Sequence, residues 1–166
     1  MGLYSEMIEE EKIFERLEDS KNILLITCPG CACESLSYSE EIPCRKIEER
    51  DMEKNALATL EVRNKWINKL SNQGKNVKTI NVIFPCEMFD DERDKITNNL
   101  NNVDTVLILA CSSAYVGIKD LIKNKDIKIV PMMKTKGSFV MRLVKDESGA
   151  NSRIDKENSR IFKNKI

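Results

Sequence analysis

The chain has 166 residues, of which 27 are lysine or arginine, 27 are aspartate or glutamate and none is histidine. This length suits one domain with its own hydrophobic core. The balanced charge disfavours a dedicated nucleic-acid binder, which needs an excess of cations. Because no imidazole is present, Ser-His-Asp and Cys-His nucleophiles and zinc sites that use histidine are excluded.

The chain also contains six cysteines. Its N-terminal residues lack a basic stretch followed by an apolar segment, so we expect no export signal and a cytoplasmic, reducing location. No apolar run approaches the roughly twenty residues that span a bilayer, so we expect a soluble protein without membrane contact. In a reducing compartment, grouped cysteines are more often metal-binding or redox-active than a disulfide framework.

The first half of the chain predicts two helices and a buried strand. Apolar residues at helical spacing behind Ser5 predict an amphipathic helix over residues 5–19. Residues 21–28 are a short apolar run, which is typical of a strand buried on both faces. Residues 28–51 lack periodicity and predict a long loop or short helix. The clearest helical pattern covers residues 52–71.

The second half alternates apolar runs with helical patterns. The runs predict strands over residues 77–84, 105–110 and 125–130, and the helical patterns cover residues 90–100 and 112–122. Alternating strands and helices are typical of a parallel sheet with right-handed crossovers. We therefore predict an α/β fold: a single domain with a mainly parallel four-stranded sheet and flanking helices, in Rossmann-like or flavodoxin-like order.

The C-terminal region predicts less regular structure. Residues 138–145 predict an extra strand, so that residues 1–145 make up the α/β metal- or cluster-binding domain. Residues 146–166 are polar and basic and predict a frayed tail or a surface helix. Since Phe162 is the only aromatic residue in this segment, a nucleic-acid-binding arm is disfavoured.

Three cysteines follow three different predicted strands. Cys28, Cys86 and Cys111 each stand at or just beyond the carboxyl end of an apolar run, and Cys31 lies three residues after the first of them. Ligands bind at this edge of open α/β sheets, and neighbouring strands are only about 4.8 Å apart. We therefore expect these four thiols to converge on one metal site.

Four thiolates suit either a tetrahedral zinc ion or an iron–sulfur cluster, and the ligand set alone does not decide between them. Two cysteines are left over, Cys33 and Cys44, and Cys33 is a candidate substitute for Cys31 as a ligand. No carboxylate stands out as a general acid or base, and no glycine-rich nucleotide motif is present. We therefore predict no catalytic residue.

Two other interpretations remain open. Cys28-Pro-Gly-Cys31 follows a strand and resembles the redox dithiol of thioredoxin-like enzymes, with Pro85 or Pro131 as the facing proline. A thiol–disulfide oxidoreductase is therefore one alternative. The other is an interaction module, either with structural zinc or without metal, because free cysteine is often a small buried hydrophobe.

Three stretches together resemble a known family. Residues 22–31 (Asn-Ile-Leu-Leu-Ile-Thr-Cys-Pro-Gly-Cys), Pro85-Cys-Glu87 and Leu107-Ile-Leu-Ala-Cys111 are similar to the N-terminal domain of the small subunit of acetogen-type methylenetetrahydrofolate reductase. The resemblance covers roughly residues 9–135. The chain departs from the family in an insertion-like stretch around residues 37–51 and in the absence of a second cysteine-rich segment.

The resemblance implies an iron–sulfur protein of one-carbon (folate) metabolism in anaerobes. It implies a cluster, 4Fe-4S, bound by Cys28, Cys31, Cys86 and Cys111. It also implies a flavoprotein large subunit as partner, within a hetero-oligomer whose folate chemistry belongs to that partner. The chain would then be a non-catalytic, electron-transfer subunit of an oxidoreductase. Because the second cysteine-rich segment is missing, the resemblance does not extend to a complete electron relay.

Overall fold

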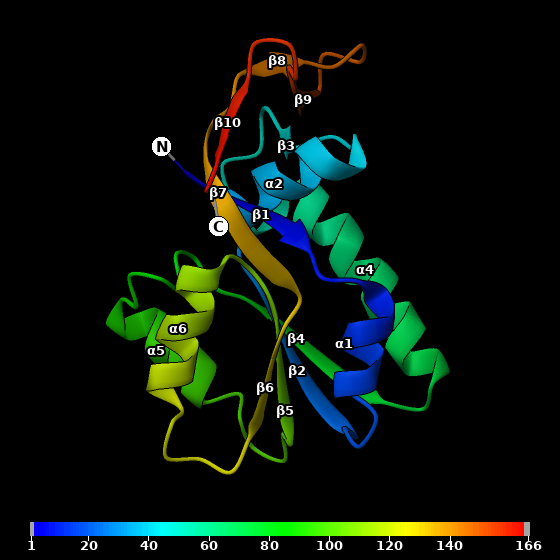
Figure 1. Ribbon diagram of the computed structural model, residues 1–166, viewed down its shortest axis with the longest axis vertical. Helices are drawn as coiled ribbons and strands as arrows, with labels where there is room; N and C mark the ends of the chain where they lie inside the picture. Colours follow the sequence, from blue (N-terminus) through cyan, green and yellow to red (C-terminus); the bar gives the residue numbers. More distant parts are fainter. Residues whose placement is uncertain (1, 165–166) are drawn as a thin grey trace.

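A four-stranded parallel sheet forms the centre of the protein, as Figure 1 shows in a computed structural model that describes residues 2–164. Its strands are β4 (Asn76–Asn81), β2 (Asn22–Thr27), β5 (Thr105–Leu109) and β6 (Lys128–Pro131), in the order β4-β2-β5-β6. The first of these strands in the chain therefore lies between the second and the third. This is the flavodoxin-like order, and the α/β prediction is confirmed.

Helices cover both faces of this sheet. In Figure 1, α1 (Glu10–Arg16) and α4 (Leu57–Asn72) lie on one side, and α5 (Asp90–Thr97) and α6 (Ser112–Leu121) lie on the other. Strands buried on both faces need apolar side chains at every position rather than at alternate ones. The central strands meet this requirement, because every residue of β5 is buried.

The segment between β2 and β4 contains three helices. The first, α2 (Cys31–Glu40), occupies part of the region predicted as a loop or short helix. The helix predicted over residues 52–71 is divided into α3 (Met52–Asn55) and α4, because Ala56 has a ψ of 69° and leaves the helical region. None of the helices in residues 2–164 is long and apolar enough to span a membrane.

An antiparallel sheet lies beyond the carboxyl edge of the parallel one. It consists of β1 (Gly2–Met7), β7 (Met133–Val140) and β10 (Arg160–Lys163), with β7 in the middle. The prediction of one helix over residues 5–19 is therefore wrong at its start, where residues 5–7 belong to a strand. Pairing with β7 overrides the weak helical pattern there, and Ser5 is completely buried.

A second small antiparallel sheet contains β3 (Arg45–Lys46), β9 (Asn151–Ile154) and β8 (Leu143–Lys145). The segment predicted as a frayed tail or surface helix thus contains β9 and β10 instead. The reason is again a pairing between distant parts of the chain, since β9 pairs with β3 across more than a hundred residues. Such pairings leave no local signal in a polar sequence.

Asp104 connects the beginnings of β2 and β5. Its Oδ2 accepts hydrogen bonds from the backbone N–H of Lys21 at 3.0 Å and of Asn22 at 2.7 Å. Burial disfavours the charged carboxylate, but these donors outweigh that effect and lower the pKa of Asp104. The ionised carboxylate therefore stabilises the folded state.

We expect Asp104→Asn to lower the free energy of unfolding at pH 7 by about 1.5–3 kcal/mol, because a hydrogen bond to a charged acceptor contributes that much. A carboxyl whose pKa is lowered by folding stabilises the protein above its unfolded pKa of about 3.9, and this contribution disappears as the pH falls through the folded pKa. The difference between wild type and variant should therefore shrink below pH 4 in urea unfolding. An equal difference at pH 7 and pH 2.5 would contradict this role.

Candidate metal centre

Cys28 and Cys31 stand at the junction between β2 and α2. Cys28 is the first residue after β2, is buried, and donates its backbone N–H to Leu109 O at 3.3 Å at the end of β5. Cys31 is the first residue of α2 and is partly exposed. Both thiols are therefore at the carboxyl edge of the parallel sheet, and Cys31 is at a helix N-terminus, which favours a thiolate.

Cys111 has an equivalent place after β5. It is the residue directly before α6, and it is buried. The first turn of α6 is held against β7 by two hydrogen bonds: Ser112 N–H donates to Thr135 Oγ1 at 2.9 Å, and Thr135 N–H donates to Ser112 Oγ at 3.1 Å. This pair fixes the helix N-terminus next to the Cys111 thiol.

Cys86 lies in a tight turn beyond β4 and is exposed. Phe84 and Met88 on either side of it both have a φ of 51°, and Glu87 N–H closes the turn on Phe84 O at 2.8 Å. Left-handed backbone costs a side-chain-bearing residue about 1–2 kcal/mol. Because two such residues flank Cys86, the turn depends on contacts with neighbouring segments to hold it.

Those contacts come from the Cys28–Cys31 loop and from α6. A Cβ built on Gly30 would lie 3.5 Å from Cys28 Sγ and 3.5 Å from Phe84 Cε1. A Cβ on Gly117 in α6 would lie only 2.7 Å from Pro85 O. The turn that contains Cys86 is therefore packed between the segments that bear Cys28 and Cys111.

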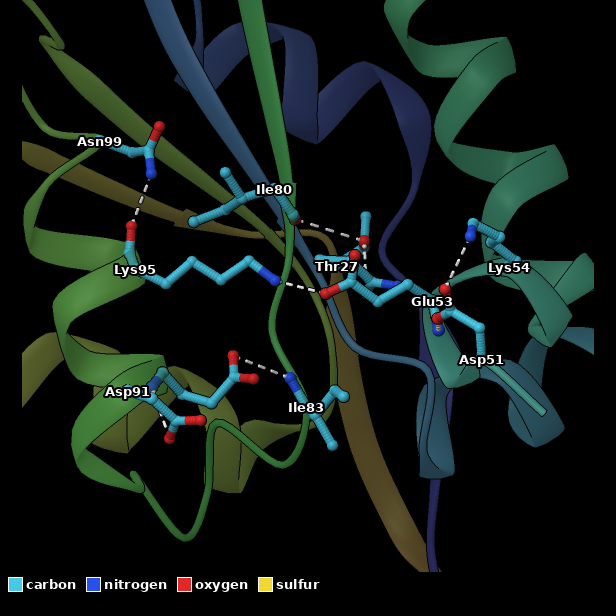
Figure 2. Close-up of polar contacts among 11 residues, drawn as sticks. Thr27, Asp51, Glu53, Lys54, Ile80, Ile83, Asp91, Lys95 and Asn99 are labelled. Atoms are coloured by element: carbon cyan, nitrogen blue, oxygen red, sulfur yellow. Dashed lines mark hydrogen bonds and ion pairs between the residues drawn. The ribbon is translucent and has the colours of Figure 1, made fainter.

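Polar contacts also hold the ends of β2 and β4 in place, as Figure 2 shows. Thr27 Oγ1 donates to Asn81 Oδ1 at 3.0 Å, which ties the end of β2 to the end of β4. Ile83 N–H donates to Glu92 Oε2 at 3.1 Å, and Lys95 forms an ion pair with Glu53 across the end of β4. In the sequence, the acidic residues at the start of α5 indicate only a favourable first helical turn. The role of Glu92 in positioning the segment that contains Cys86 could not be predicted from them.

The electrostatics place the four thiols in one group, called here the cysteine group: Cys28, Cys31, Cys86 and Cys111. Burial raises the pKa of Cys28 to about 12, and the proximity of the other three thiols adds to this effect. Burial also raises the pKa of Cys31 and Cys86, and in both cases Cys111 contributes. A cation bound among these thiols would favour their deprotonated form.

Backbone N–H groups point at two of the sulfurs. Gly30 N–H donates to Cys28 Sγ at 3.4 Å. A hydrogen bond from the backbone of Leu3 opposes the effect of burial on the pKa of Cys31, and a Cβ on Gly2 would lie 3.2 Å from Cys31 Sγ. Strand β1 therefore packs directly against the cysteine group. Sequence reasoning missed this contribution because it assigned part of the segment to a helix.

Cys33 and Cys44 form a separate pair. Both are completely buried, and Cys33 Sγ donates to Cys44 O at 3.2 Å. Hydrogen bonding between the two thiols lowers the pKa of Cys33 and raises that of Cys44. Because residues two apart on a helix face different directions, Cys33 points away when Cys31 faces the cysteine group. The placement does not support Cys33 as a substitute ligand.

The thiols of the cysteine group are neighbours but are not gathered on one point. Within residues 2–164, no three cysteine, aspartate or glutamate side chains lie close enough together to bind a single metal ion as they stand. Binding a metal or cluster would require the side chains to rotate towards a common centre. Of the four, Cys31 and Cys86 are the least enclosed.

A cavity of about 730 Å³ lies elsewhere, between the end of α2 and β9. Its charged lining residues include Glu41 and Lys156, which form an ion pair at 2.5 Å. Cations and anions alternate around it, so it presents no surface of one charge. We find no chemical function for this cavity, whereas the cysteine group has a defined set of donors.

The close packing of α6 on the Cys86 turn leads to a testable prediction. In an exposed helix, glycine to alanine usually stabilises a protein by about 0.5–1 kcal/mol. At Gly117 the added methyl would meet a backbone oxygen, so we expect Gly117→Ala to destabilise the protein by about 1–2 kcal/mol in urea unfolding. Ser113→Ala, at an exposed position of the same helix, is the control. A Gly117→Ala variant more stable than wild type would contradict this packing.

Taken together, three strand ends and the first residue of α2 bring Cys28, Cys31, Cys86 and Cys111 to one edge of the parallel sheet. Two of the four, Cys31 and Cys111, stand at helix N-termini. Searches for related proteins add nothing to this geometry. No family model matches the chain, and neither the curated proteins nor the solved structures include a significant match.

Proposed function

We propose that the chain is a cytoplasmic electron-transfer subunit that binds one 4Fe-4S cluster through Cys28, Cys31, Cys86 and Cys111. The single observation behind this proposal is that the four cysteines lie at one edge of the parallel sheet, on segments that pack against one another. Four cysteine thiolates are the usual ligand set of such a cluster. When bound, the cluster would supply one-electron redox chemistry.

The chain's own residues suit this role in two further ways. Hydrogen bonds to sulfur raise the potential of a cluster, and Gly30 N–H and the backbone of Leu3 already point at two of the sulfurs. Cys86 is exposed, so electrons have a short path from the protein surface.

A single zinc ion is the plainer occupant of the same four residues. With Zn–S bonds of about 2.3 Å and tetrahedral geometry, it would hold the four Sγ atoms about 3.8 Å from one another. In a four-iron cluster each thiolate binds a different iron, so the ligands stand further apart. Zinc would hold the four sulfurs closer together than a cluster would, and it is the second candidate.

The thiol–disulfide oxidoreductase is less well supported. A nucleophilic thiol needs a lowered pKa, whereas burial raises the pKa of both Cys28 and Cys31. We expect alkylation by iodoacetamide at pH 7 to be slow at both residues, as measured by mass spectrometry of the apoprotein. Rapid, selective labelling of Cys31 would instead favour the dithiol enzyme.

The resemblance to the small subunit of methylenetetrahydrofolate reductase supplies the metabolic setting of the proposal. It suggests a flavoprotein large subunit as partner and one-carbon metabolism as the pathway. On this proposal the chain transfers electrons and leaves the folate chemistry to its partner. The direct test is the iron and sulfide content of anaerobically purified protein, and its outcomes close the Discussion.

A further inference from the structure

Exposed apolar side chains lie in the segment that contains Cys86 and in α6, which packs against that segment. Phe84 is 37% exposed, Phe89 is 55% exposed and Val116 is 63% exposed. They belong to two segments in contact, since Met88 Cε lies 3.3 Å from where a Cβ on Gly117 would be. We call the surface formed by Phe84, Met88, Phe89 and Val116 the Phe89 face.

The Phe89 face is not explained by the core of this chain. Side chains this exposed gain little from folding, and contiguous apolar surface on a soluble protein often marks an interaction site. The turn that presents it includes the two left-handed residues, Phe84 and Met88. Strained backbone of this kind persists where the surrounding structure holds it and clusters at functional sites.

The charge beside the Phe89 face is strongly negative. Residues 87–94 contain five carboxylates and one guanidinium, although the whole chain has no net charge. Glu87, Asp90 and Asp91 are exposed, and Arg93 makes only a long contact of 3.8 Å with Asp90. A partner that matches this surface has an apolar contact area bordered by lysine or arginine.

We propose that the Phe89 face docks a basic electron-carrier protein, which approaches the exposed Cys86 through an apolar contact bordered by cations. This inference rests on the proposed function, because Cys86 is there a cluster ligand. Cys28, Cys31, Cys86 and Cys111 would hold the cluster, which would supply one electron to the oxidised carrier without the formation or breaking of a bond. A small face suits such a partner, since electron-transfer complexes bury little area and dissociate quickly.

The probe for the test is ferric cytochrome c, a basic carrier with an exposed haem edge. Its affinity is measured by calorimetry at low ionic strength, which does not depend on turnover. We expect Phe89→Ser and Val116→Ser each to weaken binding about tenfold. The matched controls are Phe162→Ser in β10 and Val140→Ser in β7, whose side chains are 53% and 54% exposed. They should change the affinity less than about twofold.

The charges are tested by the salt dependence of the electron-transfer rate in stopped flow, with protein that has been reduced by dithionite and then separated from the excess dithionite. We expect the second-order rate constant of wild type to fall several-fold between about 20 and 200 mM salt, because salt screens exposed charges. The double variant Asp90→Asn with Asp91→Asn should show a much flatter dependence. The control is Lys134→Gln, at an exposed position of β7, which should leave the salt dependence of the rate unchanged.

Equal affinities for Phe89→Ser and Phe162→Ser, or a rate independent of salt, would overturn the docking proposal. So would sedimentation showing a wild-type dimer that Phe89→Ser dissociates, because the occupant would then be a second copy of the chain. Iron and sulfide are measured in every sample. A protein without iron that still binds the probe through Phe89 would contradict the cluster, whereas a loaded protein insensitive to Phe89 would contradict only the docking face.

Discussion

Replacing Cys86 with serine is expected to reduce bound iron from about four atoms per chain to well below one, because a 4Fe-4S cluster needs all four thiolates. Cys86 is exposed, so the substitution should leave the fold intact. The measurement is iron and acid-labile sulfide after anaerobic purification, with circular dichroism as the check on folding. Full iron occupancy in both Cys86→Ser and Cys111→Ser would refute this ligand set.

A matched pair of buried cysteines separates ligation from packing. Cys28 and Cys33 are both buried, but only Cys28 belongs to the cysteine group. Cys28→Ala and Cys33→Ala each remove one buried sulfur atom. Both should therefore lower the free energy of unfolding of the apoprotein by a similar amount, about 1 kcal/mol. We expect Cys33→Ala to retain about four irons and Cys28→Ala to lose them. The reverse result would exchange the roles of the two residues.

Leu107→Ala is expected to produce the largest loss of stability among the substitutions considered. Leu107 lies in β5, between β2 and β6, and its side chain is completely buried. Truncating a fully buried leucine creates a cavity and costs about 3–4 kcal/mol. That is a large share of the 5–15 kcal/mol typical of a whole domain.

The control for Leu107 is Leu143→Ala. Leu143 lies in β8 and is 42% exposed, so its truncation should cost less than about 1 kcal/mol. Both variants are measured by urea unfolding of the apoprotein, so that loss of a cluster does not contribute. A Leu107→Ala variant no less stable than Leu143→Ala would show that β5 is not the packed centre of the sheet.

The parallel sheet was predictable because its signal is local. Its two central strands, β2 and β5, are short and mainly apolar, and such runs alternating with helical patterns allow few topologies. The antiparallel sheets gave no such signal. The first strand, Gly2–Met7, pairs with residues more than 120 positions away, and the polar segment Asn151–Ile154 becomes a strand only because β3 and β8 flank it.

The candidate site was predictable in outline for the same reason. Thiols that follow parallel strands must meet at one edge, so Cys28, Cys86 and Cys111 are brought together by topology. The details depend on tertiary contacts. The left-handed turn around Cys86, the hydrogen bond from Ile83 to Glu92 and the packing of Gly2 beside Cys31 follow from no local pattern.

The different roles of Cys31 and Cys33 depend on a local feature that the sequence does not reveal. That feature is the start of α2 at Cys31, which makes the two residues neighbours on a helix rather than in a loop. Without that boundary, Cys31 and Cys33 are equivalent candidates for one ligand position. Helix starts are the least predictable feature of a sequence that lacks a capping residue, and Gly30 provides no side-chain cap here.

The central claim is that the cysteine group binds a 4Fe-4S cluster, and its most direct test is analysis of the protein purified without oxygen. Iron, zinc and acid-labile sulfide are measured together with the visible absorption spectrum. We predict about four irons and four sulfides per chain, together with visible absorption. One zinc and no sulfide would make the site structural, and a protein free of both metals would contradict the account.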